Sequence, residues 1–169
     1  CDDVDDCVGE YDSCGLCNGP GQEIECWDGS FVCEELDCPL DCDNCPSWDS
    51  DGDGYFDDIN LYQNSGSITS SVYLEGENIG SQNDLLAAFV NDELRGLGFP
   101  TEVPFGPLAG TYQFLTLIYS NEASGELIDF KFYDYESDQV YDISESGEFI
   151  SDMIEGSVVD PIVLNVNIG

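Results

Sequence analysis

The sequence predicts a mainly β protein in which a disulfide-rich, irregular N-terminal arm and a calcium loop precede an antiparallel β-sandwich. Three observations support this prediction. All nine cysteines lie within the first 45 residues, and an aspartate-rich run follows at residues 49–60. Beyond it, short apolar runs alternate with turn residues at intervals of about 8–12 residues, which is typical of an antiparallel sandwich. We therefore divide the chain into an arm over residues 1–46, a calcium-binding joint over 47–60 and a sandwich over 61–169.

The arm cannot fold on a hydrophobic core alone, because a segment of this length buries too little surface to offset the entropy of ordering it. Its cysteine density is typical of secreted disulfide scaffolds, and each loop closed by a disulfide contributes about 2–3 kcal/mol in the chain-entropy model. Two short apolar stretches around an Asp-Gly turn, within residues 25–33, predict a small hairpin. The disulfide candidates are Cys1, Cys7, Cys14, Cys17, Cys26, Cys33, Cys38, Cys42 and Cys45.

Two Cys-x-x-Cys pairs, at residues 14–17 and 42–45, leave a zinc site open as an alternative. Disulfides are favoured because five further cysteines interleave with these pairs and because the arm has no basic residue. A redox-active pair would need a βαβ context, which this segment lacks. Since nine is an odd number, one thiol has no partner within the chain. Cys1 is our candidate, and a preceding segment, another molecule or a lipid could bond to it.

The charge of the chain restricts its partners and its surroundings. There are 37 acidic residues against two basic ones, which gives a formal net charge of −35. Nucleic acids and anionic membrane surfaces need cationic contacts, so this charge excludes both. Bound cations or a salty medium relieve such self-repulsion. No apolar run is long enough to span a bilayer. We therefore expect an extracellular or cell-surface protein, and a processed product or a segment of a longer one.

The aspartate-rich run predicts a calcium site. A calcium loop of 12 residues supplies oxygen ligands from positions 1, 3, 5, 7, 9 and 12, with glycine at position 6 for a turn that needs a positive φ. Gly54 occupies position 6 when the count begins at residue 49. The candidate ligands are then Asp49, Asp51, Asp53, the Tyr55 carbonyl, Asp57 and Asn60.

Position 12 departs from the usual loop. Asn60 cannot supply a bidentate carboxylate, so either Asp58 substitutes for it or the affinity for calcium is low. Flanking helices are not expected, which predicts a structural site and not a sensor. The alternative is a solvated acidic turn, but repulsion between neighbouring aspartates favours a bound cation. Asp41 and Asp43 are candidate ligands of a second, adjacent ion.

Residues 37–60 resemble the thrombospondin type-3 repeat, in which Asp-Asn-Cys-Pro precedes an Asp-x-Asp-x-Asp-Gly calcium loop. The match lies in Asn44-Cys45-Pro46 and in the aspartates of the run. The arm also resembles short cysteine-rich repeats that occur in tandem in large secreted proteins of environmental bacteria. Both resemblances imply an extracellular, calcium-binding protein.

Strands are predicted in the remaining chain from β-branched and aromatic residues bounded by turn signals. Asn91-Asp92 predicts a two-residue hairpin turn, and Ile128, Phe130 and Phe132 fall on one face. The terminal strand pairs in its own sheet or adds to an exposed edge of a neighbour. The predicted strands are 67–75, 85–90, 93–98, 112–119, 127–133 and 162–168, with shorter ones at 140–143 and 148–150.

The segments 87–96, 114–121 and 125–134 together are similar to β-sandwich modules of secreted and surface-anchored proteins of environmental Gram-negative bacteria. This similarity covers about residues 67–165 and implies an extracellular binding or structural module with no known enzymatic chemistry. The chain also lacks histidine, which removes the commonest general base and every Ser-His or Cys-His arrangement. We therefore do not expect an enzyme.

The leading hypothesis is a non-enzymatic, calcium-binding structural protein, a subunit of an extracellular filament or surface assembly joined head-to-tail through the arm and the sandwich. Its partners would be copies of itself or neighbouring surface proteins. The alternative is a carbohydrate-binding or adhesive module of a larger secreted protein, with glycans as partners. The candidate aromatic platform for sugar, whose members also suit cross-strand pairs, is Tyr112, Tyr119, Tyr133, Tyr135 and Tyr141.

The two basic residues, Arg95 and Lys131, both lie in predicted strands. Either they form local ion pairs with nearby carboxylates, or they mark the point where an acidic partner docks.

Overall fold

The computed structural model describes residues 9, 14, 17, 18, 21, 24–25, 31–33, 45–49 and 52–169. The chain forms two compact units, Cys1–Cys42 and Asp43–Gly169. The described part of the aspartate-rich run therefore belongs to the same unit as the sandwich.

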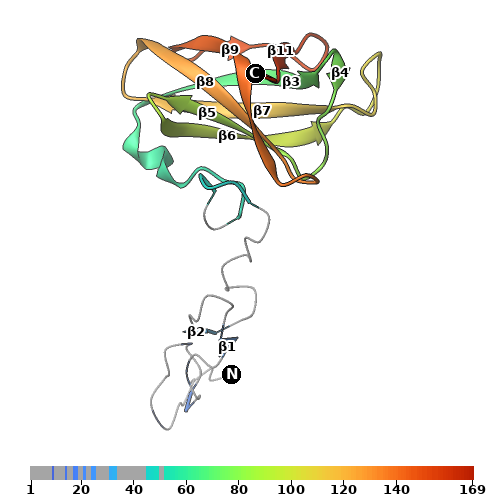
Figure 1. Ribbon diagram of the computed structural model, residues 1–169. Coiled ribbons are helices and arrows are strands. Elements are labelled where there is room, and N and C mark those ends of the chain that lie inside the picture. The colour runs from blue at the N-terminus through green and yellow to red at the C-terminus, as the bar shows by residue number, and fades with distance from the viewer. Residues whose placement is uncertain are drawn as a thin grey trace, which may run out of the picture. The chain divides into compact units, whose positions relative to one another are not determined.

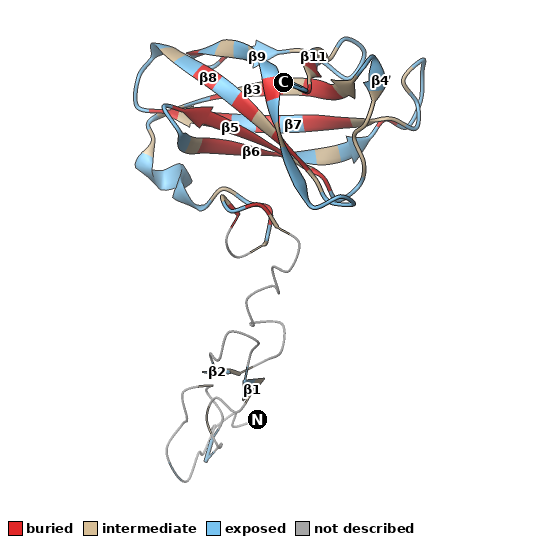
Figure 2. Cartoon of the chain, viewed as in Figure 1, coloured by how far each residue is buried: buried red, intermediate tan, exposed pale blue. Residues whose placement is uncertain are grey.

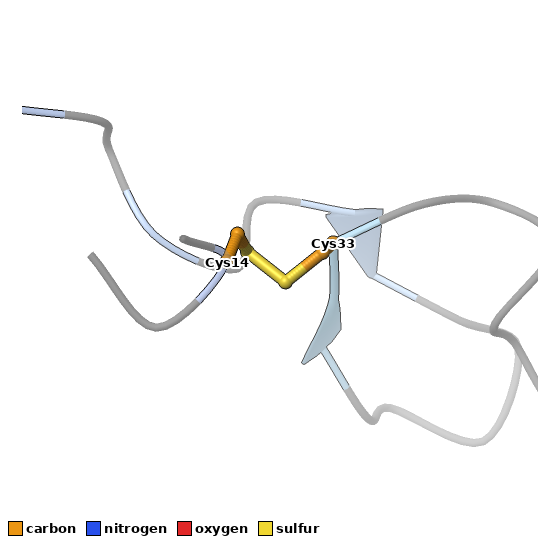
Figure 3. Close-up of a disulfide and its surroundings, with 2 residues drawn as sticks. All are labelled: Cys14 and Cys33. Carbon is orange, nitrogen blue, oxygen red and sulfur yellow. A yellow bond between two sulfur atoms is a disulfide. The ribbon is translucent and has the colours of Figure 1, made fainter. Parts of the chain in front are cut away.

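The described residues of the first unit confirm the predicted hairpin and a disulfide. Strand β1 (Ile24–Glu25) pairs antiparallel with β2 (Phe31–Val32). Cys14 and Cys33 form a disulfide with their Cα atoms 5.5 Å apart, as Figure 3 shows. Cys17 and Cys45 are also disulfide-bonded. Sulfur atoms in disulfides do not act as thiolate ligands, so a zinc site at these four cysteines is excluded. The remaining candidates lie outside the described residues: Cys1, Cys7, Cys26, Cys38 and Cys42.

The second unit is built from one nine-stranded sheet (Figure 1). Its strand order is β10-β3-β7-β6-β5-β8-β9, and β4 and β11 also pair with β3. A short 3-10 helix, η2, precedes the sheet. The elements are η2 (Asp57–Leu61), β3 (Asn64–Leu74), β4 (Glu77–Asn78), β5 (Leu85–Val90), β6 (Glu93–Glu102), β7 (Tyr112–Ser120), β8 (Ser124–Asp134), β9 (Gln139–Ile150), β10 (Ile154–Glu155) and β11 (Ile162–Asn165).

The sheet curls so that its two halves enclose the main core, which confirms the predicted sandwich. Phe114 of β7 meets Phe132 of β8 edge to face, with 5.7 Å between the ring centroids. Val166, just after β11, bridges to Ile143 of β9. Figure 2 shows buried residues along the central strands. The core consists of Ile68, Val72, Leu86, Ala88, Val90, Phe114, Ile118, Ile128, Phe130, Phe132, Ile143, Phe149, Met153, Leu164 and Val166.

The predicted hairpin between β5 and β6 is also confirmed. Asn91 and Asp92 connect the paired residues Val90 and Glu93 and have φ values of 50° and 64°. Two positive φ angles are the signature of a type I′ turn, whose twist suits a two-residue hairpin. The pairing shifts after Ala88, so that β6 carries a bulge close to the turn.

Two features of the sheet differ from the sequence prediction. Residues 140–143 and 148–150 are parts of one long strand, β9, whose pairing with β8 shifts register between them. The terminal strand β11 pairs within its own sheet, but it runs parallel to β3, as does β10. All the other strand pairs are antiparallel.

Candidate calcium site

The described part of the segment from Cys45 to Tyr62, residues 45–49 and 52–62, packs on the outer face of the sheet. A second apolar cluster, separate from the main core, lies on that face over β5 and β6 and consists of Ala87, Phe89 and Leu97. The partly buried side chains packed against this cluster are Trp48, Phe56 and Leu94. The segment thus covers apolar surface that a sandwich alone would leave exposed.

Aromatic contacts fix the segment both before and within the aspartate-rich run. Before the run, Trp48 meets Phe89 edge to face, with 5.6 Å between ring centroids. Within it, Phe56 stacks on Tyr119 of β7 at 5.6 Å. Sequence reasoning missed these two contacts, although the available signal was an aromatic residue just before the run and another within it.

A tight turn formed by Asp49 and residues 52–54 lies at the centre of the candidate site. Asp49 is buried, and its Oδ2 accepts the N–H of Gly54 at 3.1 Å. Gly54 has a φ of 72°, which confirms the positive φ expected at position 6. Its Cα lies close to Leu85 and Phe99 of the sandwich, since an added Cβ would be 3.4 Å and 3.6 Å from their side chains. The turn is therefore shaped by its glycine and rests on the sandwich.

Backbone N–H groups also orient a second carboxylate. Asp53 Oδ1 accepts the N–H of Tyr55 at 2.7 Å. The backbone closes the start of the turn, where the N–H of Asp49 donates to the Pro46 carbonyl at 2.9 Å. The carboxylates at positions 1 and 5 are thus both hydrogen-bonded to the loop's own backbone.

The later candidate ligands lie in and beside the 3-10 helix. Asp57, Asp58 and Asn60 are all on η2 and all exposed. Asp41, Asp43 and Asp51 fall outside the described residues. Among the residues that the structure describes, no group of three or more Asp, Glu, Cys or His side chains is arranged to hold a metal. Calcium binding at residues 49–60 therefore stays a prediction, supported by the turn and not by an assembled ligand set.

A cavity of about 290 Å³ opens between the turn and the end of the sandwich. Asp84 stands in its wall and is buried, and its carboxylate accepts the N–H groups of Ser81 at 2.7 Å and of Tyr135 at 3.0 Å. The lining residues are Cys45, Pro46, Asp49, Gly52, Asp53, Gly54, Gln82, Asn83, Asp84, Leu85, Phe99, Pro100, Tyr133 and Tyr135.

Arg95 is the centre of a buried polar cluster beside Tyr62, the last residue of the segment that packs on the sheet. It lies in the bulge of β6 and is 8% exposed. Its guanidinium contacts Glu126 of β8 at 3.1 Å, the Tyr119 carbonyl at 3.3 Å and Glu93 at 3.5 Å. It also lies 4.9 Å from the ring centroid of Tyr62. Arg95 is therefore not the docking point for an acidic partner.

The cluster shifts the pKa values of its acids in opposite directions. Burial alone would raise the pKa of Glu126, but hydrogen bonds from Ser120 and Arg95, together with the positive charge of Arg95, hold it below its usual value. Burial and the hydrogen bond from its hydroxyl to Glu93 raise the pKa of Tyr62 to about 12. Glu126 is therefore ionised and Tyr62 neutral throughout the physiological range.

Lys131, the other basic residue, also forms a local ion pair. Its Nζ lies 2.8 Å from Asp142 on the neighbouring strand β9, and both side chains are more than a third exposed. Arg95 and Lys131 therefore both form local ion pairs with nearby carboxylates, which was the first of the two roles that the sequence left open.

The five candidate tyrosines do not form one platform. Tyr133 is 2% exposed and donates its hydroxyl to Asp138 at 2.8 Å. Tyr141 packs against the main core, while Tyr119 stacks on Phe56 on the outer face of β7. Tyr135 remains exposed beside the cavity.

Comparisons with protein-family models, with curated proteins and with solved structures gave no match. In the part of the chain that the structure describes, no helix has the length and apolar character needed to cross a membrane.

Proposed function

We propose that this chain is a non-enzymatic, calcium-binding structural subunit of an extracellular filament or surface assembly. The observation that supports it best is the turn formed by Asp49 and residues 52–54, where Gly54 at positive φ donates its N–H to the carboxylate of Asp49. The same turn rests on the sandwich through Leu85 and Phe99. A cation bound there would fix the start of the sandwich unit and relieve local repulsion between carboxylates.

The extracellular setting is supported by the cysteines. Disulfides persist in oxidising compartments and are rare in the cytosol, and Cys14–Cys33 is a disulfide. Extracellular fluids also supply calcium at concentrations that suit weak sites, with Kd values of about 10⁻⁴–10⁻³ M. A weak site is what Asn60 at position 12 implies, because it lacks the closing carboxylate. The net charge of −35 is tolerated best in such a medium.

Electron microscopy of the purified chain tests the assembly directly. We expect ordered oligomers or filaments in millimolar calcium, their loss on addition of a chelator and their return when calcium is restored. Mass spectrometry under non-reducing conditions would show whether disulfides join the copies. Monodisperse single particles in both calcium and chelator would contradict the proposed assembly.

A further inference from the structure

Another cavity of the sandwich unit combines aromatic rings with carboxylates. It has a volume of about 300 Å³ and lies between the segment that packs on the sheet and the first residues of β6. It shares no lining residue with the cavity beside the turn at Asp49. We call it the aromatic pocket. Its lining includes four aromatic residues, Trp48, Tyr55, Phe56 and Tyr62, and three acidic ones, Asp57, Asp58 and Glu93.

Contacts within the sandwich unit hold most of the rings of the aromatic pocket in place. Trp48 and Phe56 pack on aromatic rings of β5 and β7, with 5.6 Å between the ring centroids in each case. The Tyr62 hydroxyl donates to Glu93 at 2.7 Å. Tyr55 is 63% exposed, so its ring is accessible to a ligand. Because three of the four rings are already ordered, a ligand that enters the pocket loses less binding free energy to side-chain entropy.

The two basic residues of the chain do not line the aromatic pocket. Arg95 contacts Glu93 at 3.5 Å, but it binds Glu126 through two shorter contacts, at 3.1 Å and 3.3 Å. Lys131 is paired with Asp142. The three carboxylates of the pocket thus exceed the positive charge that the chain places beside them, and a second copy has both of its basic side chains in the same ion pairs. The pocket therefore suits a positive charge that a different molecule supplies.

The arrangement of the aromatic pocket favours an organic cation over a metal ion. In the part of the chain that the structure describes, no three acidic side chains are arranged to hold a metal, so Asp57, Asp58 and Glu93 do not converge on one ion. A quaternary ammonium group needs no converging oxygens, because aromatic rings attract it within about 6 Å of their centroids. The same kind of contact already exists at the wall of the pocket, where the Arg95 guanidinium lies 4.9 Å from the ring centroid of Tyr62. A neutral sugar could stack on these rings, but it would leave the negative charge uncompensated.

We propose that the aromatic pocket binds a small quaternary ammonium compound. Small-molecule sites have volumes of about 300–1,000 Å³, and this pocket is at the lower end of that range, which favours a compact ligand. The methyl groups of the ligand contact the aromatic rings, and the carboxylates attract its charge. A phosphocholine headgroup of a lipid is disfavoured, because its phosphate would meet the same carboxylates. The binding does not depend on the turn at Asp49, so it stands or falls separately from the proposed function.

Titration of the full chain with choline, followed by tryptophan fluorescence, tests this binding, because Trp48 lines the pocket. The titration is run in EDTA, so that calcium does not compete for Asp57 and Asp58, and at physiological ionic strength, which screens non-specific attraction to the acidic surface. We expect saturable binding in the millimolar range or tighter. The alcohol 3,3-dimethyl-1-butanol has the shape of choline without its charge, and we expect it to bind about tenfold more weakly. The absence of saturable choline binding, or equal binding of the alcohol, would overturn the proposal.

Three substitutions locate the bound cation. Glu93→Gln removes one carboxylate of the pocket and keeps an oxygen acceptor for the Tyr62 hydroxyl, and we expect it to weaken choline binding several-fold. Tyr55→Ala removes an accessible ring, and we expect a similar loss. Glu148→Gln is the matched control, because Glu148 is exposed on β9, outside the pocket, and the change in net charge is the same as in Glu93→Gln. Thermal unfolding checks that all three variants fold. Equal effects of Glu93→Gln and Glu148→Gln on choline binding would overturn the assignment of the pocket.

Discussion

The curled sheet has two outer regions, one over β3-β7-β6 and one over β8-β9. They differ in which charged side chains they expose to solvent. Aligned positions on β8 and β9 expose ionised side chains, including Asp129, Asp142 and Glu148. Over β3, β7 and β6, the aligned residues Thr69, Leu115 and Phe99 carry no charge. The ion pair beside them, Arg95 with Glu126, is largely buried and lies against Tyr62. Charged side chains are thus exposed over β8 and β9, whereas Arg95 and Glu126 are paired largely out of contact with solvent.

The sheet contains one buried and one exposed ion pair, and the cost of breaking each pair can be measured. Arg95 and Glu126 have side chains that are only 10% and 19% exposed, whereas those of Lys131 and Asp142 are 37% and 68% exposed. A buried pair is expensive to break because the remaining charge is left without compensation. An exposed pair is screened and contributes little.

Arg95→Ala is expected to have the largest effect. It leaves the Glu126 carboxylate buried without its cation, which costs about 3 kcal/mol of unfolding free energy. Urea unfolding of the full chain measures this loss. The double variant Arg95→Met with Glu126→Gln serves as the control, and it recovers part of the loss because no charge remains buried. A loss below about 1 kcal/mol for Arg95→Ala would place the pair in the same class as an exposed one.

The second largest effect is expected from acid, which should reduce the stabilisation that the buried pair of Arg95 and Glu126 gives to the folded chain. The pKa of Glu126 is lower in the folded chain than its usual value, so its contribution is present above the usual pKa, about 4.3, and is lost as pH falls through the folded value. Urea unfolding of the wild type and of Glu126→Gln between pH 7 and pH 3 isolates this contribution from the other acids. The difference in unfolding free energy between the wild type and Glu126→Gln is expected to become smaller as the pH falls. A constant gap would show that Glu126 does not titrate in this range.

Lys131→Ala is expected to have the smallest effect. The pair with Asp142 is exposed, so its loss costs between about 0 and 1 kcal/mol and becomes smaller still in high salt. The same urea experiment, at low and high sodium chloride, measures it. A loss of unfolding free energy as large as that of Arg95→Ala would contradict the distinction between a buried pair at Arg95 and an exposed pair at Lys131.

Much of the fold could be predicted from local sequence patterns. The alternation of Ile128, Phe130 and Phe132 fixes the inner face of β8, and Asn91-Asp92 supplies a turn that requires positive φ. The direction of β11 could not be predicted in this way, because parallel and antiparallel neighbours suit the same apolar run. The burial of Arg95 depends on the β6 bulge and on Tyr62, which lies far away in sequence.

The candidate site also has features that the sequence predicted and features that it could not predict. Spacing alone predicted the turn and its glycine, and the structure confirms the positive φ of Gly54. The packing of Trp48 and Phe56 on the sheet could not be predicted, because it depends on which strands become neighbours.

Calcium-dependent thermal unfolding of the full chain tests the central claim most directly, by calorimetry in 10 mM calcium and in 10 mM magnesium. If Kd is about 10⁻⁴ M, calcium at 100 times Kd stabilises the wild type by about 2.7 kcal/mol. Asp49→Asn, which keeps an oxygen acceptor for the Gly54 N–H, loses the calcium-specific shift in melting temperature. Asp129→Asn, which makes the same change in charge on exposed β8, retains it. Equal shifts with both metals, or equal shifts in the two variants, would contradict a calcium site at residues 49–60.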